Sequence, residues 1–326
     1  MAATLSVASP TEIEAIYRES HALWGAGLSY SDYVEFWADV RETGWARDHY
    51  RHLVWADGRG GILSSLKLYR PEVRLGRRRV RAAGIGAVFT PVRHRRKGHA
   101  AAMLRAVVQE ARRRGDAFAI LFTDIGTEYY ARLGFQALPA FESWGRLPAR
   151  LRAATGLSLR SMDVEDLPRV REAHDSWCAP RPFAFLRDDA QWGYLLVRAA
   201  SFYRRYDGSD LTQRYRLALR DGRFCGYLVA VEGVGQWVVR EVGARDGDLD
   251  VMADILRAGG MEARAAGLHQ VYGWLAPGLA ERMPEWRLRT EPRKQAIPMV
   301  APLDEGFGWQ DLGPGEDGFL PFLDQF

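Results

Sequence analysis

Cysteine is almost absent from this sequence of 326 residues, which holds only Cys178 and Cys225. Two cysteines are too few for a framework of disulfide bonds, and they lack the CxxC spacing of a metal or redox site. We therefore expect two reduced thiols and no metal. No apolar run reaches about 18 residues, and the N-terminus lacks a basic head followed by an apolar block. These absences predict a cytoplasmic protein with no membrane partner.

Lysine is scarce as well, since Lys67, Lys97 and Lys294 are the only lysines among 45 basic residues. The arginine clusters at residues 77–79 and 112–114 are suited to phosphate. However, the formal net charge is only +4 over the whole length, which is weak evidence for nucleic-acid binding. We expect no nucleic-acid partner.

The chain is longer than one typical domain of about 100–200 residues, so two domains are expected. Its hydrophobic content of 47% is typical of an ordered globular protein. The composition changes near residues 147–156, and the chain becomes aromatic and acidic after Asp304. We therefore divide it into residues 1–150, residues 151–304 and a tail, 305–326, that we expect to pack back on the body.

The first half alternates strands and helices in an order typical of one α/β domain. Helical spacing occurs within residues 13–50 and 98–115. Strands are predicted over the remaining apolar and alternating segments, namely residues 3–8, 53–56, 62–69, 73–80, 83–90, 117–122 and 138–144. From Leu157 onward a similar order of elements returns, which indicates an internal repeat.

A basic glycine turn follows the apolar run that ends at Thr90. The start of a helix offers backbone N–H groups and a favourable dipole to phosphate. Gly98 and Ala100 leave room for a pyrophosphate, and positive charge comes from the preceding residues, which are Arg95, Arg96 and Lys97. The pattern is weak by itself. An ordinary strand-to-helix turn with a solvated basic rim is the alternative.

A tyrosine farther along the chain is the second candidate. If acetyl-coenzyme A lies with its pyrophosphate on the turn, its pantetheine can lie along the strand that ends at Thr90. A correctly placed Tyr130 can then protonate the leaving thiolate, and a backbone N–H near Phe89 or Thr90 can stabilise the oxyanion. Alternatively, Tyr130 packs beside Leu133 and Phe135.

These motifs resemble the GNAT superfamily of acyl-CoA-dependent N-acetyltransferases over about residues 60–140. The residues that carry the resemblance are Val88-x-Thr90, Arg95-x-x-Gly98-x-Ala100 and Tyr130-x-x-x-Gly134-Phe135. It implies direct transfer of an acetyl group from acetyl-CoA to a primary amine, with Tyr130 as general acid. The implied coenzyme contacts are main-chain groups of Val88, Phe89 and Thr90 on pantetheine, and the turn of Arg95, Arg96, Lys97, Gly98, His99 and Ala100 on pyrophosphate. The asparagine that many members carry early in the last helix is missing, and Asp124 and Thr127 lie in that neighbourhood.

The degenerate second half and the C-terminal aromatic residue resemble the enhanced intracellular survival type of acetyltransferase. That resemblance implies an α/β (α+β) fold of two tandem acetyltransferase-like domains, each a mixed, mostly antiparallel sheet flanked by helices. It also implies a catalytic role for the terminal carboxylate of Phe326. The acidic segment 244–250 would repel pyrophosphate, so we expect the second half to bind no coenzyme A and to wall the acceptor pocket.

The acceptor is expected to be an amine of a small molecule or a protein. Trp24, Tyr30, Tyr33 and Trp37 are candidate lining residues, although core packing explains them equally well. The acidic tail indicates a cationic amine. The candidate proton acceptors are the Phe326 carboxylate, Asp124, Glu128, Glu142 and His99.

Two other functions remain open. One is a non-catalytic acyl-CoA-binding sensor or regulatory protein, since binding and catalysis use different residues. The other is a nucleic-acid surface formed by the arginine clusters, which would show steeply salt-dependent binding. The sequence does not determine the oligomeric state.

Overall fold

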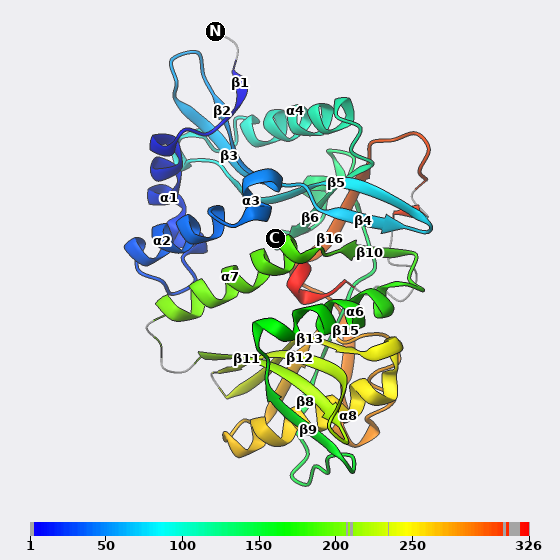
Figure 1. The fold of residues 1–326 in the computed structure, drawn as a ribbon. Helices are drawn as coiled ribbons and strands as arrows, with labels where there is room; N and C mark the ends of the chain where they lie inside the picture. Colours follow the sequence, from blue (N-terminus) through cyan, green and yellow to red (C-terminus); the bar gives the residue numbers. More distant parts are fainter. Residues whose placement is uncertain are drawn as a thin grey trace.

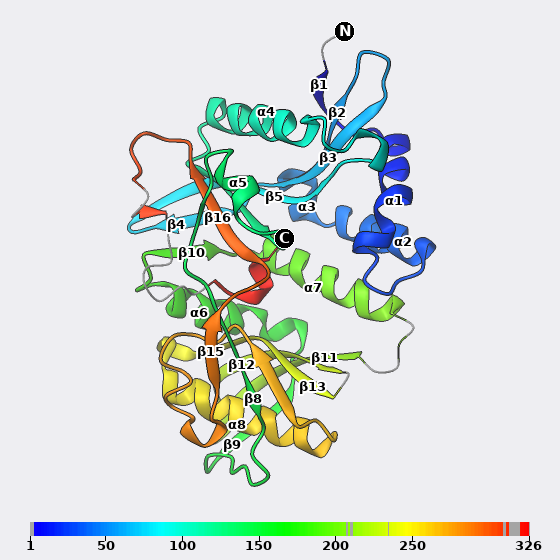
Figure 2. The same ribbon diagram turned by 180° about the vertical axis from the view of Figure 1, so that it is seen from behind.

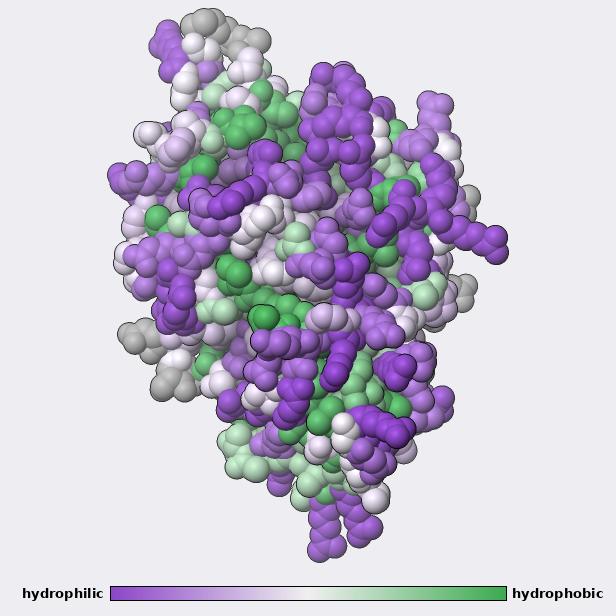
Figure 3. All heavy atoms as spheres, in the orientation of Figure 1, coloured by the Kyte–Doolittle hydropathy of each residue, from purple (hydrophilic) through white to green (hydrophobic). Residues whose placement is uncertain are grey.

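The computed structural model describes residues 3–206, 208, 211–233, 235–308, 311–312 and 320–325. Two lobes are built around two β-sheets, with helix α7 (Asp189–Arg205) and the C-terminal segment 320–325 between them (Figure 1). Hydrophilic side chains cover most of the face shown in Figure 3, where hydrophobic ones occur in small patches. Within the described residues, no helix is long and apolar enough to cross a membrane.

The first sheet has the strand order β1-β2-β3-β5-β6-β16-β7. Only β5 and β6 pair in parallel, and the other neighbours pair antiparallel. A side ribbon is formed by β4 on β5 and β10 on β4. The strands are β1 (Thr4–Val7), β2 (Tyr50–Ala56), β3 (Ile62–Tyr69), β4 (Glu72–Leu75), β5 (Arg78–Phe89), β6 (Phe118–Thr123), β7 (Gln136–Ala137), β10 (Phe183–Leu186) and β16 (Ile297–Pro302).

The second sheet has the order β15-β8-β14-β13-β12-β11-β9. Again one pair is parallel, β13 with β14, and the other neighbours are antiparallel. The strands are β8 (Phe141–Arg146), β9 (Leu157–Ser161), β11 (Leu211–Arg220), β12 (Arg223–Gly233), β13 (Gln236–Ala244), β14 (Gln270–Gly273) and β15 (Arg289–Pro292).

The helices begin where the sequence supplies capping side chains. Ser9 caps the first helix in a capping box with Glu12, and Ser29 and Thr43 cap the next two. Besides α7, the α-helices are α1 (Pro10–Trp24), α2 (Tyr30–Arg41), α3 (Gly44–His49), α4 (His99–Arg113), α5 (Glu128–Ala131), α6 (Leu167–Cys178) and α8 (Leu249–Ala265). Short 3₁₀ helices lie at η1 (Val92–His94), η2 (Val164–Asp166), η3 (Arg245–Gly247), η4 (Pro284–Trp286) and η6 (Phe322–Asp324).

The two sheets exchange a strand. We expected residues 138–144 to close the first sheet, but this prediction is wrong, because β8 pairs with β14 of the second sheet. In return, β16 crosses back and pairs with β6 of the first sheet. Figure 2 shows β16 in orange in the upper lobe and β8 in the lower lobe. Each exchanged strand covers the open edge of a parallel pair, which removes an exposed sheet edge.

The predicted internal repeat is visible in the order of the elements. The series β1, α1, α2, β2, β3, β5, α4, β6 has its counterpart in β9, α6, α7, β11, β12, β13, α8, β14. In both series the parallel pair is joined through the long helix, α4 or α8. The predicted fold class, with two mixed, mostly antiparallel sheets flanked by helices, is confirmed.

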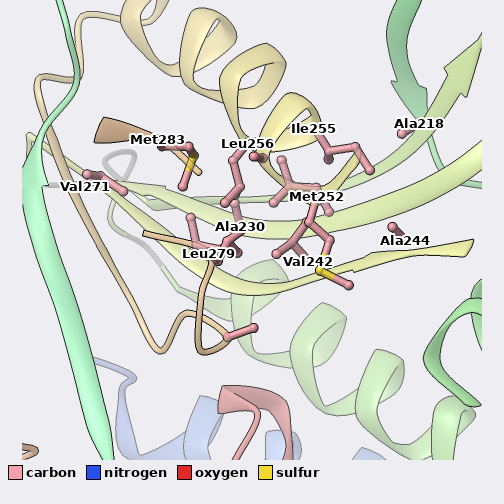
Figure 4. Close-up of a cluster of buried hydrophobic side chains, with 14 of the residues drawn as sticks. Ala218, Ala230, Val242, Ala244, Met252, Ile255, Leu256, Val271, Leu279 and Met283 are labelled. Carbon is pink, nitrogen blue, oxygen red and sulfur yellow. The ribbon is translucent and has the colours of Figure 1, made fainter. Parts of the chain in front are cut away.

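The second lobe has its own core between α8 and its sheet (Figure 4). Met252, Ile255 and Leu256 of α8 are completely buried there. Gly259 allows the close approach of helix and sheet, since a Cβ at this position would lie 2.5 Å from Leu228 Cδ2. The second lobe therefore has a close-packed core of its own.

Candidate active site

A cavity of about 790 Å³ lies where the two lobes meet. The first lobe lines it with residues of α1, α2, β3, β5 and β6 and with the loop after β6. The second half contributes side chains of α7, β11 and β13, and the end of the chain contributes Phe322, Leu323 and Gln325. The second half thus walls this cavity.

One side of the cavity is an opening between β5 and β6. The parallel pairing of these strands ends at Ile85 and Leu121, and beyond it Gly86, Ala87 and Val88 face the cavity from one strand and Phe122 and Thr123 from the other. Strands that separate in this way leave main-chain groups at the edge available to an extended ligand.

A β-bulge lies beside this opening, in the pairing of β5 with β3. Ser65 of β3 pairs with Phe89 and Lys67 pairs with Gly86, so Ala87 and Val88 stand opposite the single residue Leu66. Ala87 has φ of 47°, a left-handed conformation that is rare for a residue with a side chain. Bulges and strain of this kind occur next to active sites, where they redirect the backbone.

The basic glycine turn lies directly before α4. Gly98 is the N-cap residue with φ of 82°, and it provides no side-chain hydrogen bond to the helix start. In contrast, α1, α2, α3, α7 and α8 are each capped by a serine, threonine or aspartate side chain. The first N–H groups of α4 are therefore open to a ligand.

The charged residues of the turn fold against the turn itself. Arg95 Nε donates to the Thr90 carbonyl at 3.1 Å, and Lys97 Nζ donates to the Arg93 carbonyl at 3.0 Å. His99 makes an edge contact with the ring of His94, with 6.0 Å between centroids. Arg96, like Gly98, has a positive φ, of 60°. The turn is thus a compact basic rim around the start of α4.

The equivalent helix start in the second lobe is closed. Asp248 caps α8 by accepting hydrogen bonds from the N–H groups of Asp250 at 2.8 Å and Val251 at 3.2 Å. A capped, acidic helix start offers neither free donors nor positive charge to a phosphate. This geometry supports the expectation that coenzyme contacts belong to the first lobe.

Tyr130 lies on α5 and borders the cavity, with 8% of its surface exposed. Its ring also packs edge-on against Tyr129 and Phe135, at centroid distances of 5.0 and 6.2 Å. Burial raises the pKa of the Tyr130 phenol to about 12, and Tyr129 and Asp124 act in the same direction. The phenol is therefore protonated near neutral pH and able to donate a proton.

Two of the four aromatic candidates line the cavity, namely Trp24 and Trp37. The other two lie elsewhere. Tyr33 is buried in the core and packs edge-on against Tyr17 at 5.2 Å, and Tyr30 packs against His21 with its hydroxyl donating to the Glu14 carbonyl at 3.4 Å. Core packing accounts for these two, which was the alternative left open by the sequence.

Three cationic side chains that the sequence did not indicate also line the cavity: Lys67 of β3, Arg198 of α7 and Arg240 of β13. Lys67 is only 3% exposed, and its Nζ lies 2.9 Å from the centroid of the Trp37 ring. Burial lowers the pKa of Lys67 well below its usual value, and the nearby Arg198 and Arg41 add to this effect. A lysine in the middle of the apolar strand 62–69 was the available signal.

The C-terminal segment 320–325 is fixed by arginines. Asp324 accepts from Arg187 Nε at 2.8 Å and Nη2 at 2.9 Å, and Arg187 also binds both carboxylate oxygens of Glu241. Arg198 Nη1 donates to the Gln325 carbonyl at 2.9 Å. Phe322 stacks between the Trp274 ring and the Arg240 guanidinium, at 4.1 and 3.9 Å.

The candidate proton acceptors are placed differently. Asp124 lines the cavity and accepts from the Ala296 N–H at 2.8 Å. Glu142 accepts from the Tyr272 hydroxyl at 2.7 Å, and Glu128, Glu142 and His99 do not line the cavity. Phe326 lies outside the described residues, and its neighbour Gln325 lines the cavity.

The chain is similar to a known protein family in sequence and to solved structures in fold. Residues 6–138 match the family described as acetyltransferase (GNAT) domain. A GCN5-related N-acetyltransferase from Anabaena variabilis has a TM-score of 0.71 at 14% identity, covering 93% of this chain and 73% of that chain. Eis1 from Mycobacterium abscessus has a TM-score of 0.57 at 13% identity, covering 92% and 74%.

A tandem GNAT protein from the clavulanic acid biosynthesis pathway has a TM-score of 0.55 at 14% identity, covering 93% of this chain and 99% of that chain. By sequence, no curated protein matches the chain. At these identities the solved structures show the fold, and they confirm the tandem arrangement predicted from the repeat.

Proposed function

We propose that the protein is an N-acetyltransferase, because residues 6–138 match the acetyltransferase (GNAT) domain family, in agreement with the sequence motifs. It transfers an acetyl group from acetyl-CoA directly to a primary amine of a small molecule or a protein. The observation that carries this proposal is the opening between β5 and β6, which leads into a cavity bordered by Tyr130.

The coenzyme is proposed to bind across the first lobe. Its pyrophosphate lies on the turn of residues 95–100, where the uncapped start of α4 supplies N–H groups. Its pantetheine extends along the main chain of Val88, Phe89 and Thr90 in the opening beside β6. Ser64 supports this edge, since its hydroxyl donates to the Phe89 carbonyl at 2.6 Å. The thioester then reaches the cavity beside the bulge at Ala87.

In the proposed reaction the amine nitrogen attacks the thioester carbon. The C–N bond forms, the carbonyl oxygen carries the negative charge, and main-chain N–H groups near Phe89 and Thr90 stabilise it. The C–S bond then breaks, and Tyr130 protonates the departing thiolate. Asp124 or the Phe326 carboxylate takes the proton that the amine loses, directly or through water.

The division of labour follows the proposed domains, which are residues 1–150, residues 151–304 and the tail 305–326. The first domain binds the coenzyme, and its sheet is completed by β16 from the second domain. The second domain walls the acceptor side of the cavity through α7, β11 and β13. Phe322, Leu323 and Gln325 of the tail form part of the cavity wall. The position of Gln325 at its wall supports a role there for the Phe326 carboxylate.

The test is to incubate purified protein with acetyl-CoA and a panel of amines while following the release of free thiol. The proposal expects thiol release in proportion to an acetylated product. Saturable coenzyme binding without thiol release for every amine would instead support the non-catalytic sensor.

A further inference from the structure

We propose that the acceptor carries a carboxylate in addition to its amine, and that Lys67, Arg198 and Arg240 bind this carboxylate in the cavity. The inference rests on the proposed function and deepens it by naming the substrate class. It starts from the uneven distribution of charge around the cavity.

The three cations come from three elements, β3, α7 and β13, and all of them line the same cavity. Arg198 is near enough to both others to oppose their protonation by charge repulsion. Among the described residues that line the cavity, Asp124 is the only carboxylate. It lies beside Tyr130, on the side where the coenzyme is proposed to bind. The acceptor side therefore carries a surplus of positive charge.

In the described part of the chain, none of these three cations forms an ion pair with a carboxylate. Lys67 Nζ lies over the Trp37 ring, and the Arg240 guanidinium lies over the Phe322 ring at 3.9 Å. Arg198 donates to the Gln325 carbonyl. The buried Arg187 nearby is different, since it binds two carboxylates, those of Glu241 and Asp324.

A buried cation without a counter-ion is costly, because the charge has lost its hydration and gained no partner. Lys67, with 3% of its surface exposed, bears part of this cost, since the Trp37 ring is the partner of its ammonium group. An acceptor carboxylate would supply the missing negative charge, and the planar guanidinium groups suit it geometrically. Aromatic rings of Trp24, Phe36 and Phe202 also line the cavity and favour an apolar body between carboxylate and amine. An amino acid or a short peptide has this combination.

An acceptor with a carboxylate differs from the cationic amine that the acidic tail led us to expect. Asp324, which stands between the cavity-lining residues Leu323 and Gln325, is held by Arg187 and is 5% exposed. It is not available to bind a cationic amine. A polyamine would instead bring more positive charge to Lys67, Arg198 and Arg240.

The competing anion is the terminal carboxylate of Phe326, one residue beyond Gln325. If it fills the subsite permanently, a carboxylate on the acceptor brings no advantage. The experiment separates the two cases with matched acceptors that differ only in the anionic group.

Thiol release from acetyl-CoA is measured with phenylalanine, phenylalaninamide and phenethylamine, with spermidine as a cationic comparison. The inference expects kcat/KM for phenylalanine to exceed the values for its amide and for phenethylamine by roughly 10- to 100-fold, as expected for a charge-assisted contact. In Arg240→Gln and Lys67→Met this preference shrinks, mainly because KM for phenylalanine rises. Arg204→Gln is the matched control, since Arg204 lies on α7 but is exposed and pairs with Asp39. It should keep the preference.

Equal or better turnover of the carboxylate-free amines would overturn the inference and leave the proposed acetyltransferase intact. The absence of thiol release with every amine would contradict the proposed function itself. In that case calorimetric binding of phenylalanine and phenylalaninamide decides the inference separately. It stands if only phenylalanine binds and Arg240→Gln weakens that binding, and it fails if the two ligands bind alike.

Discussion

The ion pair of Asp324 with Arg187 anchors the C-terminal segment 320–325 at the cavity. Asp324 and Arg187 are 5% and 2% exposed, and their side chains share two hydrogen bonds of 2.8 and 2.9 Å. Asp324→Asn keeps the shape of the side chain but removes the charge and turns one acceptor into a donor that faces the guanidinium. Phe322, Leu323 and Gln325, which surround Asp324 in the sequence, all line the cavity. Loss of the anchor should therefore loosen one wall of the site.

Four effects set the magnitude of the change in stability. A hydrogen bond to a charged group contributes about 1.5–3 kcal/mol, and removing one partner of a buried ion pair costs about 3–5 kcal/mol. Arg187 keeps its second carboxylate, Glu241, which reduces the loss. Burial also raises the pKa of Asp324, so part of the pair's attraction already offsets desolvation. We expect Asp324→Asn to destabilise the segment by about 2–4 kcal/mol.

The assay combines urea denaturation with the rate of thiol release. Asp324→Asn should lower the free energy of unfolding, or release the segment locally to protease, and turnover should fall with it. Glu305→Gln is the control, because Glu305 is an exposed carboxylate of the same tail, and exposed substitutions usually change stability by less than about 0.5 kcal/mol. If Asp324→Asn matches the wild type in stability, protease resistance and turnover, the segment is not held by this pair.

Three further predictions concern buried charge and helix capping. Lys67→Met should raise the unfolding midpoint at neutral pH by an amount worth about 1–4 kcal/mol, because it removes a buried cation that has no carboxylate partner among the described residues. Since the pKa of Lys67 is lowered in the folded state, this gain in stability should shrink as the pH rises toward the ordinary lysine pKa. A gain that does not depend on pH would refute the prediction. Glu241→Gln tests acid stability. Burial raises the pKa of Glu241, but Arg187 and His174 outweigh burial and hold the pKa below its usual 4.5. The stability that this carboxylate contributes is therefore present above pH 4.5 and lost as the pH falls below it. On acid titration followed by circular dichroism the wild type should lose more stability than the variant, and equal losses would contradict this. Asp248→Ala removes the N-cap of α8 and should lower the free energy of unfolding by about 1 kcal/mol in urea without changing the affinity for acetyl-CoA. Tighter coenzyme binding by this variant would place coenzyme in the second lobe.

Most individual elements of the fold could be predicted from local patterns. The capping serine at position 9, the apolar strand at residues 62–69 and the apolar face of α4 are all local signals, and the structure has the elements they predict. The partner of a strand is not a local property. Residues 138–144 show a strand pattern that is equally compatible with either sheet, and only the tertiary structure sends β8 to the second lobe.

The residues of the candidate site also differ in whether a local sequence pattern indicates them. The turn at Gly98 and the tyrosine at position 130 belong to contiguous motifs, so the sequence could indicate both. Lys67, Arg198 and Arg240 stand far apart in the sequence, and no motif joins them. They meet because α7 and β13 of the second half fold over the cavity of the first. The same holds for Asp324, whose role depends on an arginine 137 positions away.

The measurement that tests the central claim most directly is the comparison of Tyr130→Phe with the wild type in single-turnover thiol release, alongside the dissociation constant of acetyl-CoA. Tyr129→Phe, a neighbouring phenol that does not line the cavity, is the matched control. The account predicts that Tyr130→Phe lowers the rate by about 10²- to 10⁴-fold while coenzyme affinity stays unchanged, and that Tyr129→Phe retains the rate. A Tyr130→Phe protein that releases thiol at the wild-type rate would contradict it.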